Sequence, residues 1–515
     1  MIYFIPSWYN PSRKWYTTDH TWFLKNEVMD FDDISTQSRL FQNGKEEIKL
    51  IILKYAPSIR RFLHRQTILR VPYWSVFDEL QSYEHDYVRP INYLTMEWPE
   101  DVSFHYNPYI VNVMKDDEIF ARVYPTQDGT LFSVRYYKGG IPAYEHVYDD
   151  RGFFSSVLIY DEKGEPDRQN YLSIEGDQVI SEQLKTGKVI VSPKHTDRFQ
   201  KQEYDSIGDM IQERLQAYLQ SHDDAADTLV LALDEQHNQL VLDSLGKQTL
   251  ILSEYSGRAN DRSPELVARS KAIFTDDINT DHEKETLPVL RIYPLENQAT
   301  FGASTNESNL YISLFIDNLS KEELDDIVSN IMKHLDNNER TMLLLCTFRC
   351  TEIEYVQQIE GAVKKYNNLL AEKEKTEVTD VFVAEMMGSK EARIQIASMG
   401  REVELLQTIA KSRVYIDLGE PENGSLNTEA ICAGVPQIKR KESTFLTHMK
   451  NGYIVHNNSE IDDALNFFLV GLKNWNESLL YYTQLKEEYT DEQILSRWDS
   501  LKEEIMHEDS SNRLQ

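Results

Sequence analysis

The feature that most constrains the fold is the alternation of apolar runs and helical patterns in the second half of the chain. Apolar runs at Leu310–Phe315, Thr341–Phe348 and Val414–Leu418 are separated by amphipathic patterns such as Lys321–Leu335. Short apolar runs rich in β-branched residues are typical of strands that helices bury on both faces. The alternation therefore predicts an α/β fold with a doubly wound parallel sheet. We also expect a helix over residues 390–409 and a strand over Val378–Val383.

The middle of the first half of the chain shows a different period of apolar residues, the two-residue alternation of a strand. Thr130–Tyr137 alternates, with Phe132, Val134 and Tyr136 on one face of the expected strand. Gly-containing turn signals such as Asp128-Gly129 separate this run from its neighbours. Several short strands joined by such turns predict an antiparallel sheet, which interrupts the α/β pattern as an insertion.

These patterns predict five parts. Residues 1–105 and 206–270 form a first Rossmann-like domain, and residues 106–205 form the inserted, extended β-sheet domain. Residues 271–474 form a second Rossmann-like domain, and residues 475–515 are helices that pack back on the first. Two Rossmann-like domains of this kind are expected to face a cleft.

The charge balance excludes some classes of partner. The 515 residues include 54 Lys and Arg against 85 Asp and Glu, a formal net charge of −31. General binding to nucleic acid or to anionic lipid needs a concentrated positive field. We therefore expect no nucleic acid partner and at most peripheral contact with a membrane.

Cysteine usage and the first residues indicate a compartment. Cys346, Cys350 and Cys432 show no disulfide or zinc spacing, which suggests a reducing environment. The apolar start of the chain stops at Pro6 and lacks a basic region, and no run approaches the ~18 apolar residues of a membrane span. We expect a cytoplasmic protein that touches at most the inner face of the membrane.

The usual motifs of enzyme sites are missing from the sequence. It contains no GxGxxG, Walker, HExxH or GxSxG pattern, and its 13 histidines show no metal-ligand spacing. We predict no catalytic residue, no cofactor and no metal site.

One segment is specific. Asp417–Pro436 reads as a strand, a polar Gly-containing loop, a helix with Glu429-Ala430, and a Gly-x-Pro turn. It is similar to the signature of retaining glycosyltransferases of the GT-B fold, and Asn451–Val455 followed by a helix also resembles that fold. In that family the loop and the helix N-terminus hold the sugar nucleotide through backbone N–H groups. The resemblance implies two Rossmann-like domains and a donor site near Gly424.

The donor-site pattern of that family is incomplete here. Glu429 matches the second of two glutamates eight apart, but Pro421 stands at the first position and Glu420 is out of register. The resemblance places Asn318 and Glu323 where the family has basic residues that contact the diphosphate. A carboxylate there would repel phosphate. We therefore predict a glycosyltransferase fold with a vestigial donor site and no transferase activity.

The resemblance extends over the whole chain. The opening segment Met1–Tyr9, the segment Val71–Gln81 and the stretch Tyr148–Phe153 resemble the first of the Asp proteins of the bacterial accessory Sec system. This family resemblance implies a role in export of glycosylated serine-rich repeat adhesins. It also implies three kinds of partner: the other two Asp proteins, a dedicated second SecA motor, and the adhesin itself.

Three functions follow as hypotheses. The first is a non-enzymatic transport factor, and the others are an active retaining glycosyltransferase for a serine-rich acceptor and a carbohydrate-binding module. Exposed aromatic side chains could stack on sugars or receive a peptide, although ordinary cross-strand packing explains most such residues. The residues predicted to line such a surface are Trp8, Tyr9, Tyr136, Tyr144, Tyr148 and Phe153.

Overall fold

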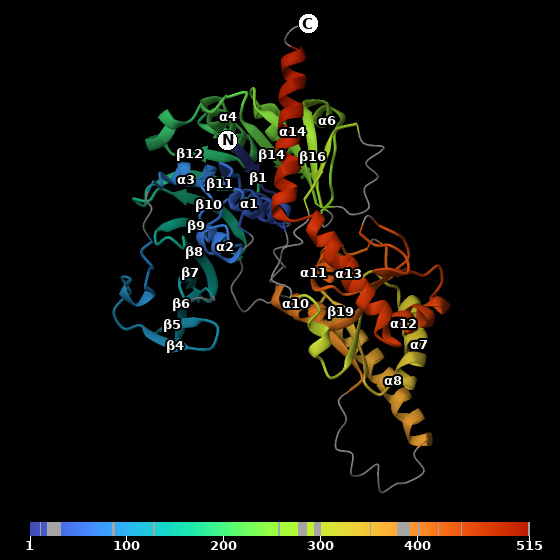
Figure 1. Cartoon of the computed structure of the whole chain (residues 1–515). Helices are drawn as coiled ribbons and strands as arrows, with labels where there is room; N and C mark the ends of the chain where they lie inside the picture. Colours follow the sequence, from blue (N-terminus) through green and yellow to red (C-terminus); the bar gives the residue numbers. More distant parts are fainter. Residues whose placement is uncertain are drawn as a thin grey trace. The chain divides into compact units, whose positions relative to one another are not determined.

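The structure is a computed structural model that divides into two compact units. Unit 1 consists mostly of residues 1–273 and unit 2 mostly of residues 274–515. Figure 1 shows the course of the chain. All residues are described except 11, 18–31, 85–87, 127–128, 256–257, 277–285, 293–299, 351, 378–391, 400–401, 421, 444 and 513–515. The five-part division stays a prediction.

Unit 1 contains strands β16-β15-β14-β1-β2-β3 in this order, and β17, the next strand beyond β16 in the sheet order, is assigned to unit 2. The pairs from β15 through β14, β1 and β2 to β3 are parallel. All four residues of β1 are buried, as expected for a strand covered on both faces. The strands are β1 (Ile2–Ile5), β2 (Ile48–Ile52), β3 (Tyr73–Ser75), β14 (Thr228–Ala232), β15 (Thr249–Glu254), β16 (Ser270–Thr275) and β17 (Val289–Arg291).

Helices connect these strands. Asp32 caps α1 and Ser206 closes a capping box on α4, so both helices begin where the sequence supplies an acceptor for free N–H groups. The helices of unit 1 are α1 (Asp33–Asn43), α2 (Ile59–Arg65), α3 (Val76–Gln81), α4 (Ile207–Ser221), α5 (Asn238–Ser244) and α6 (Pro264–Arg269).

The inserted domain is a single antiparallel sheet of ten consecutive strands, β13 to β4, which confirms the predicted insertion. Gly139 and Gly140 lie at positive φ in the tight turn between β7 and β8, a conformation that other residues rarely adopt. The strands are β4 (Ser103–Tyr106), β5 (Val111–Lys115), β6 (Glu118–Pro125), β7 (Leu131–Lys138), β8 (Ile141–Tyr148), β9 (Phe154–Tyr160), β10 (Pro166–Leu172), β11 (Gln178–Gln183), β12 (Val189–Val191) and β13 (Glu203–Tyr204).

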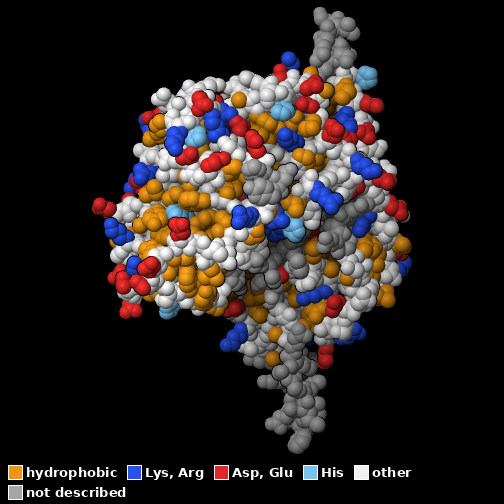
Figure 2. All heavy atoms as spheres, turned by 90° about the vertical axis from the view of Figure 1, so that its left-hand side faces the viewer, with side chains coloured by type: hydrophobic (Ala, Val, Ile, Leu, Met, Phe, Trp, Pro, Cys, Tyr) orange, Lys and Arg blue, Asp and Glu red, His pale blue; other side chains and the backbone are white. Residues whose placement is uncertain are grey.

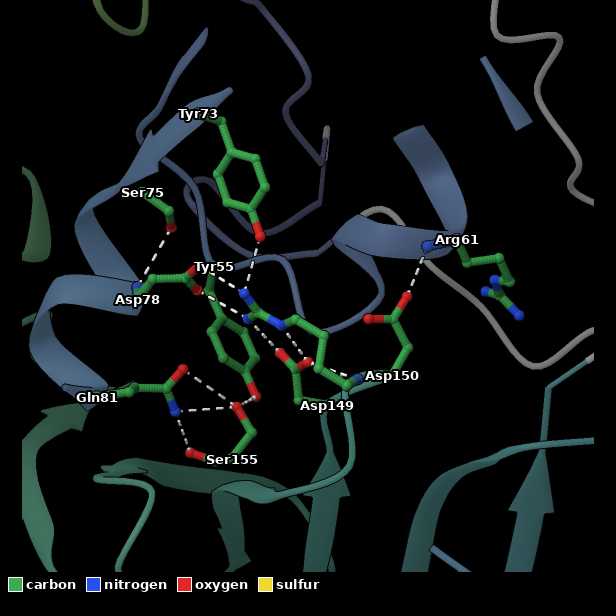
Figure 3. A network of polar contacts seen from close by, with 10 residues as sticks. Tyr55, Arg61, Tyr73, Ser75, Asp78, Gln81, Asp149, Asp150 and Ser155 are labelled. Carbon is green, nitrogen blue, oxygen red and sulfur yellow. Dashed lines mark hydrogen bonds and ion pairs between the residues drawn. The ribbon is translucent and has the colours of Figure 1, made fainter. Parts of the chain in front are cut away.

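A buried polar network joins the inserted sheet to the Rossmann-like part of unit 1 (Figure 3). Arg151, in the turn between β8 and β9, pairs with Asp149 in the same turn and with Asp78 on α3. Its Nη1 also donates to the Tyr73 hydroxyl at 2.9 Å. The Gln81 side-chain amide donates to the carbonyl oxygen of Ser155 on β9 at 2.7 Å. Burial makes each of these bonds costly to lose, so the network fixes the docking of the insertion.

Unit 2 has a six-stranded parallel sheet in the order β20-β19-β18-β21-β22-β23. From β18 the chain adds β19 and β20 on one side of the sheet, and then crosses over to add β21, β22 and β23 on the other side. The strand order therefore reverses between β18 and β21, although all the strands are parallel. The strands are β18 (Leu310–Phe315), β19 (Thr341–Thr347), β20 (Ile394–Ser398), β21 (Ser412–Asp417), β22 (Gln437–Lys439) and β23 (Gly452–Ile454).

Helices of unit 2 pack on this sheet in two apolar clusters, with α7, α8 and α12 in one cluster and α10 and α11 in the other. Leu324, Ile327 and Ile331 of α7 face the sheet at helical spacing, and all three are buried. The helices are α7 (Lys321–Asn337), α8 (Ile353–Glu377), α10 (Glu402–Ala410), α11 (Gly424–Ala433), α12 (Ile461–Leu469), α13 (Lys473–Glu488) and α14 (Asp491–Asn512).

One predicted element of unit 2 is wrong. The helix expected over residues 390–409 is replaced by strand β20 and the shorter helix α10. Ile394 and Ile396 alternate with polar residues, and pairing with β19 extends this segment as a strand. The strand expected at Val378–Val383 lies outside the described residues.

Candidate functional site

The candidate site lies in unit 2, where β18 and β21 end side by side. Open parallel sheets bind ligands outside the carboxyl ends of their strands, at the point where the strand order reverses. Here that point is formed by the loops Ile316–Ser320 and Leu418–Asn423 together with the start of α11. All five predicted donor-site positions belong to these loops or to the helices that follow them.

The carboxylate of the first loop, Asp317, is bound by residues outside that loop. Asp317 accepts hydrogen bonds from the backbone N–H of Phe348 at 2.8 Å, from the hydroxyl of Tyr355 at 3.3 Å and from the hydroxyl of Thr347. Burial nevertheless raises the pKa of the Asp317 carboxyl above its ordinary value. This carboxylate therefore ties the end of β18 to the segment after β19.

Asn318 and Glu323 occupy the positions predicted to face a diphosphate. Asn318 is exposed, and a Cβ added to Gly419 would lie 2.7 Å from the Cβ of Asn318, so the two loops touch. Glu323 accepts from the backbone N–H and the hydroxyl of Ser320 in the capping box of α7, which lowers the pKa of its carboxyl. Glu323 therefore has a structural partner at the start of its own helix.

The second loop centres on Asp417, the last residue of β21. Its Oδ2 accepts from the backbone N–H of Asn423 at 2.8 Å and from the hydroxyl of Tyr415 at 3.2 Å. Its Oδ1 is buried without a hydrogen-bond partner among the described residues. Burial raises the pKa of the Asp417 carboxyl to about 6, although the ammonium of Lys439 opposes this shift.

Two ion pairs take up the remaining charges of this loop. Lys439 has no exposed side-chain surface, and its Nζ lies 2.6 Å from Glu422. Lys441 pairs with Glu420 at 2.7 Å on the surface. Both lysines thus already have carboxylate partners from the loop, and Glu420 has an ordinary surface role.

The start of α11 is capped from within. The side chain of Asn423 accepts from the backbone N–H of Leu426 at 2.9 Å, and Gly424 is the first residue of the helix. Glu429 is buried further along the helix, where its charge raises the pKa of Cys432, although burial contributes more to that shift. The side-chain amide of Asn427 is buried, and neither its oxygen nor its nitrogen is paired within the described residues. Gly424 and Glu429 therefore both lie on α11, together with a helix start that is already capped and an amide that has no partner among the described residues.

Two parts of this site, Asp417 and Lys439, were not predicted from the sequence as site residues. Asp417 carried a usable signal, because it is a charged residue directly after the apolar residues of β21. Lys439 carried none, because β22 is only Gln437-Ile438-Lys439. Among the described residues, no cluster of His, Cys, Asp and Glu could hold a metal ion.

The aromatic residues predicted as a binding surface lie in unit 1 and fall into two groups. Trp8 is buried against Phe62, with ring centroids 4.5 Å apart, and the Tyr9 hydroxyl bonds the imidazole of His237. Tyr148 is also buried, and Phe153 stacks on Tyr83. These four positions belong to the core or its margin.

Tyr136 and Tyr144 form the second group. Their rings stack 4.7 Å apart on the inserted sheet, and Tyr144 is 37% exposed. Figure 2 views the side on which α3 and the inserted sheet lie in Figure 1, and hydrophobic side chains gather there in patches. Of the predicted surface residues, Tyr144 is exposed, whereas Tyr136 is partly buried against the apolar cluster of the inserted sheet.

Comparison with known families identifies the chain. The model of the family formed by the first Asp protein of the accessory Sec system matches residues 1–505. The chain belongs to this family. Curated members from Staphylococcus aureus and Streptococcus gordonii are 27% and 29% identical to it, each over 98% of this chain and 99% of the relative. The family resemblance found in the sequence is therefore confirmed.

Two solved structures of high similarity are complexes. A chain of the Glycosylation Associate Protein (Gap123) complex from Streptococcus agalactiae is 30% identical, with a TM-score of 0.81 over 96% of this chain and 99% of that one. A chain of the accessory secretory protein 1, 2 and 3 structure from Streptococcus pneumoniae is 27% identical, also with a TM-score of 0.81, over 98% of this chain and 100% of that one.

A glycosyltransferase shares the fold. The pneumococcal O-GlcNAc transferase GtfA, solved with UDP and GlcNAc, gives a TM-score of 0.67 at 13% identity over 98% of this chain and 99% of that one. This likeness confirms the predicted GT-B-like fold with an antiparallel sheet. In the part of the chain that is described, no helix is long and apolar enough to cross a membrane.

Proposed function

We propose that this chain is a non-enzymatic export factor that assembles with the second and third Asp proteins of the accessory Sec system. The observation that carries the proposal is the full-length family match, together with more than 25% identity to chains solved in complexes of three such proteins. The serine-rich repeat adhesin and a dedicated SecA motor complete the proposed set of partners. We place the protein in the cytoplasm, with at most peripheral contact at the inner face of the membrane.

The internal pairing at the candidate site supports the absence of activity. The end of β21, the loop after it and helix α11 together carry four carboxylates, and the two lysines of the site are bound to two of these. The residues are Asp417, Glu420, Glu422 and Glu429, with Lys439 and Lys441 as partners. A nucleotide diphosphate would meet net negative charge instead of the guanidinium and ammonium groups that bind phosphate well.

An active retaining glycosyltransferase is the second candidate. The fold of GtfA and the position of Glu429 on α11 favour it. It requires a free ammonium or guanidinium group beside Gly424, whereas Lys439 and Lys441 are engaged. Hydrolysis of a sugar nucleotide by the purified chain, lost in Glu429→Gln, would establish this second candidate.

The proposed function has a direct test. The purified chain should co-elute with the other two Asp proteins from the same bacterium. Deletion of its gene should block export of the serine-rich repeat adhesin and leave general secretion intact. Failure of both would refute the export role.

A further inference from the structure

Unit 1 contains a cavity of about 980 Å³ beside strand β3. It runs along the edge of the parallel sheet, since every residue from Leu69 to Ser75 lines it. Helices α2 and α3 and the turn that carries Arg151 form much of the remaining wall. Its volume lies at the upper end of the range for ligand sites, about 300–1,000 Å³.

Within the described lining, the arginines at the floor of the cavity are not available to a ligand. Arg151 is bound to Asp78, Asp149 and the Tyr73 hydroxyl (Figure 3). Arg198 donates to the backbone carbonyl oxygens of Leu80 and Glu79. These guanidinium groups are fixed by the fold, so recognition must come from the rim.

The rim carries two open positive charges. Arg60 on α2 and Arg70 before β3 are both exposed and line the cavity. Neither side chain makes a hydrogen bond or ion pair with another described residue, and the exposed carboxylate of the same lining is Glu84. In a chain of net charge −31, two exposed guanidinium groups beside one exposed carboxylate still favour an acidic occupant.

The remaining wall resembles a protein-binding surface. Leu69 and Val88 are 40% and 37% exposed, and the aromatic side chains of Trp74 and Tyr83 also line the cavity. Trp, Tyr and Arg are enriched at the centres of protein interfaces. An aliphatic side chain could bury itself here while a carboxylate beside it meets the rim.

The edge strand points to an extended occupant. β3 is the last strand of its sheet, and Leu50 of β2 donates to the carbonyl oxygen of Pro72 in the ladder. Because backbone groups alternate in direction along a parallel strand, the N–H and C=O of Tyr73 face away from β2. Such an edge can receive another segment by β-strand addition.

We propose that this cavity docks an extended segment of one of the two partner Asp proteins, with a carboxylate next to an apolar side chain. The proposal rests on the proposed function, because it takes the partner from the three-protein complex. The carboxylate pairs with Arg60 and Arg70, and the apolar side chain packs between Leu69, Val88 and Trp74.

The test measures binding of the full chain to each purified partner by calorimetry. Arg60→Glu with Arg70→Glu should weaken binding to one partner at least tenfold, whereas Arg60→Lys with Arg70→Lys should stay within about threefold. The matched control reverses two exposed charges outside the lining, Lys45→Glu with Lys163→Glu, and should bind like wild type. Circular dichroism checks that each variant folds.

The outcomes separate the two proposals. If the wild-type chain binds neither partner, both the assembly and the docking site are wrong. If the wild-type chain binds and the Arg60→Glu, Arg70→Glu variant binds both partners equally well, the docking site alone is wrong. An equal loss in the control variant would also overturn it, because net charge would then explain the effect.

Discussion

The positively charged side chains differ in pairing between the carboxyl edge of the unit 2 sheet and the cavity beside β3 in unit 1. At the first, Lys439 and Lys441 each have a carboxylate partner and the loop is still acidic. At the second, the buried floor is neutralised by the fold, but Arg60 and Arg70 at the rim are open. The contrast teaches that cationic side chains in one chain can be held by the fold in one region and left open in another, which is what the two proposals above depend on.

The largest effect is expected at the floor of the unit 1 cavity. Arg151→Ala leaves Asp78 and Asp149 without their guanidinium partner, and the side chain of Asp149 is only 1% exposed. Breaking a buried pair from one side costs about 3–5 kcal/mol. We expect a loss of this size in the unfolding free energy, measured by urea denaturation.

A surface arginine provides the control. Arg168→Ala on the inserted sheet removes an exposed guanidinium with no side-chain partner among the described residues. It should change the unfolding free energy by less than about 0.5 kcal/mol. If Arg151→Ala were as mild as Arg168→Ala, the network would not be what docks the insertion.

The next largest effect is expected at Asp417, at the acidic carboxyl edge of the unit 2 sheet. The pKa of Asp417 is raised to about 6, so between roughly pH 4 and pH 6 the folded state keeps a proton that the unfolded state releases. Stability should therefore fall as pH rises through this window, by roughly 1.4 kcal/mol per unit. Asp417→Asn lacks this loss and should be about 2–3 kcal/mol more stable than wild type at neutral pH, measured by urea denaturation.

The same variant supplies its own control. At about pH 4 the wild-type carboxyl is protonated in the folded state, so Asp417→Asn and wild type should unfold at nearly the same urea concentration. A constant difference between the two proteins from acid to neutral pH would show that folding does not raise the pKa of Asp417.

The smallest effect concerns Glu323. Its carboxylate accepts from Ser320 in the capping box of α7, so Glu323→Ala should cost about 0.5–1 kcal/mol of unfolding free energy. Because the pKa of Glu323 is lowered, the cost should shrink as pH falls below its ordinary value and the carboxyl becomes protonated. Glu360→Ala on α8 is the matched control, and a cost no larger than in that variant would remove the structural role.

The architecture could be predicted from the sequence because strand and helix periods differ clearly along this chain. Leu310–Phe315 is β18 with the same bounds, and the alternation at Thr130–Tyr137 corresponds to β7. The prediction of a helix over residues 390–409 was wrong because part of this segment forms the short strand β20. Such a strand is stabilised by pairing with its neighbour, here β19, more than its own sequence pattern indicates.

The sequence could predict where the candidate site lies but not which of its charged side chains form ion pairs. The motif Asp417–Pro436 located the loop and α11, and Glu429 lies there as expected. Ion pairs such as Lys439 with Glu422 join residues 17 apart in the chain and depend on the folded loop. The cavity beside β3 had no sequence signal, because its lining comes from separate elements that the turn at Arg151 brings together.

The most direct test of the account is calorimetric titration of the purified chain with UDP-N-acetylglucosamine. A donor site whose lysines are already bound to carboxylates should give no measurable heat of binding up to millimolar nucleotide sugar, for wild type and Glu429→Gln alike. Micromolar binding by wild type that is lost in Glu429→Gln would contradict the account and establish a working donor site on α11.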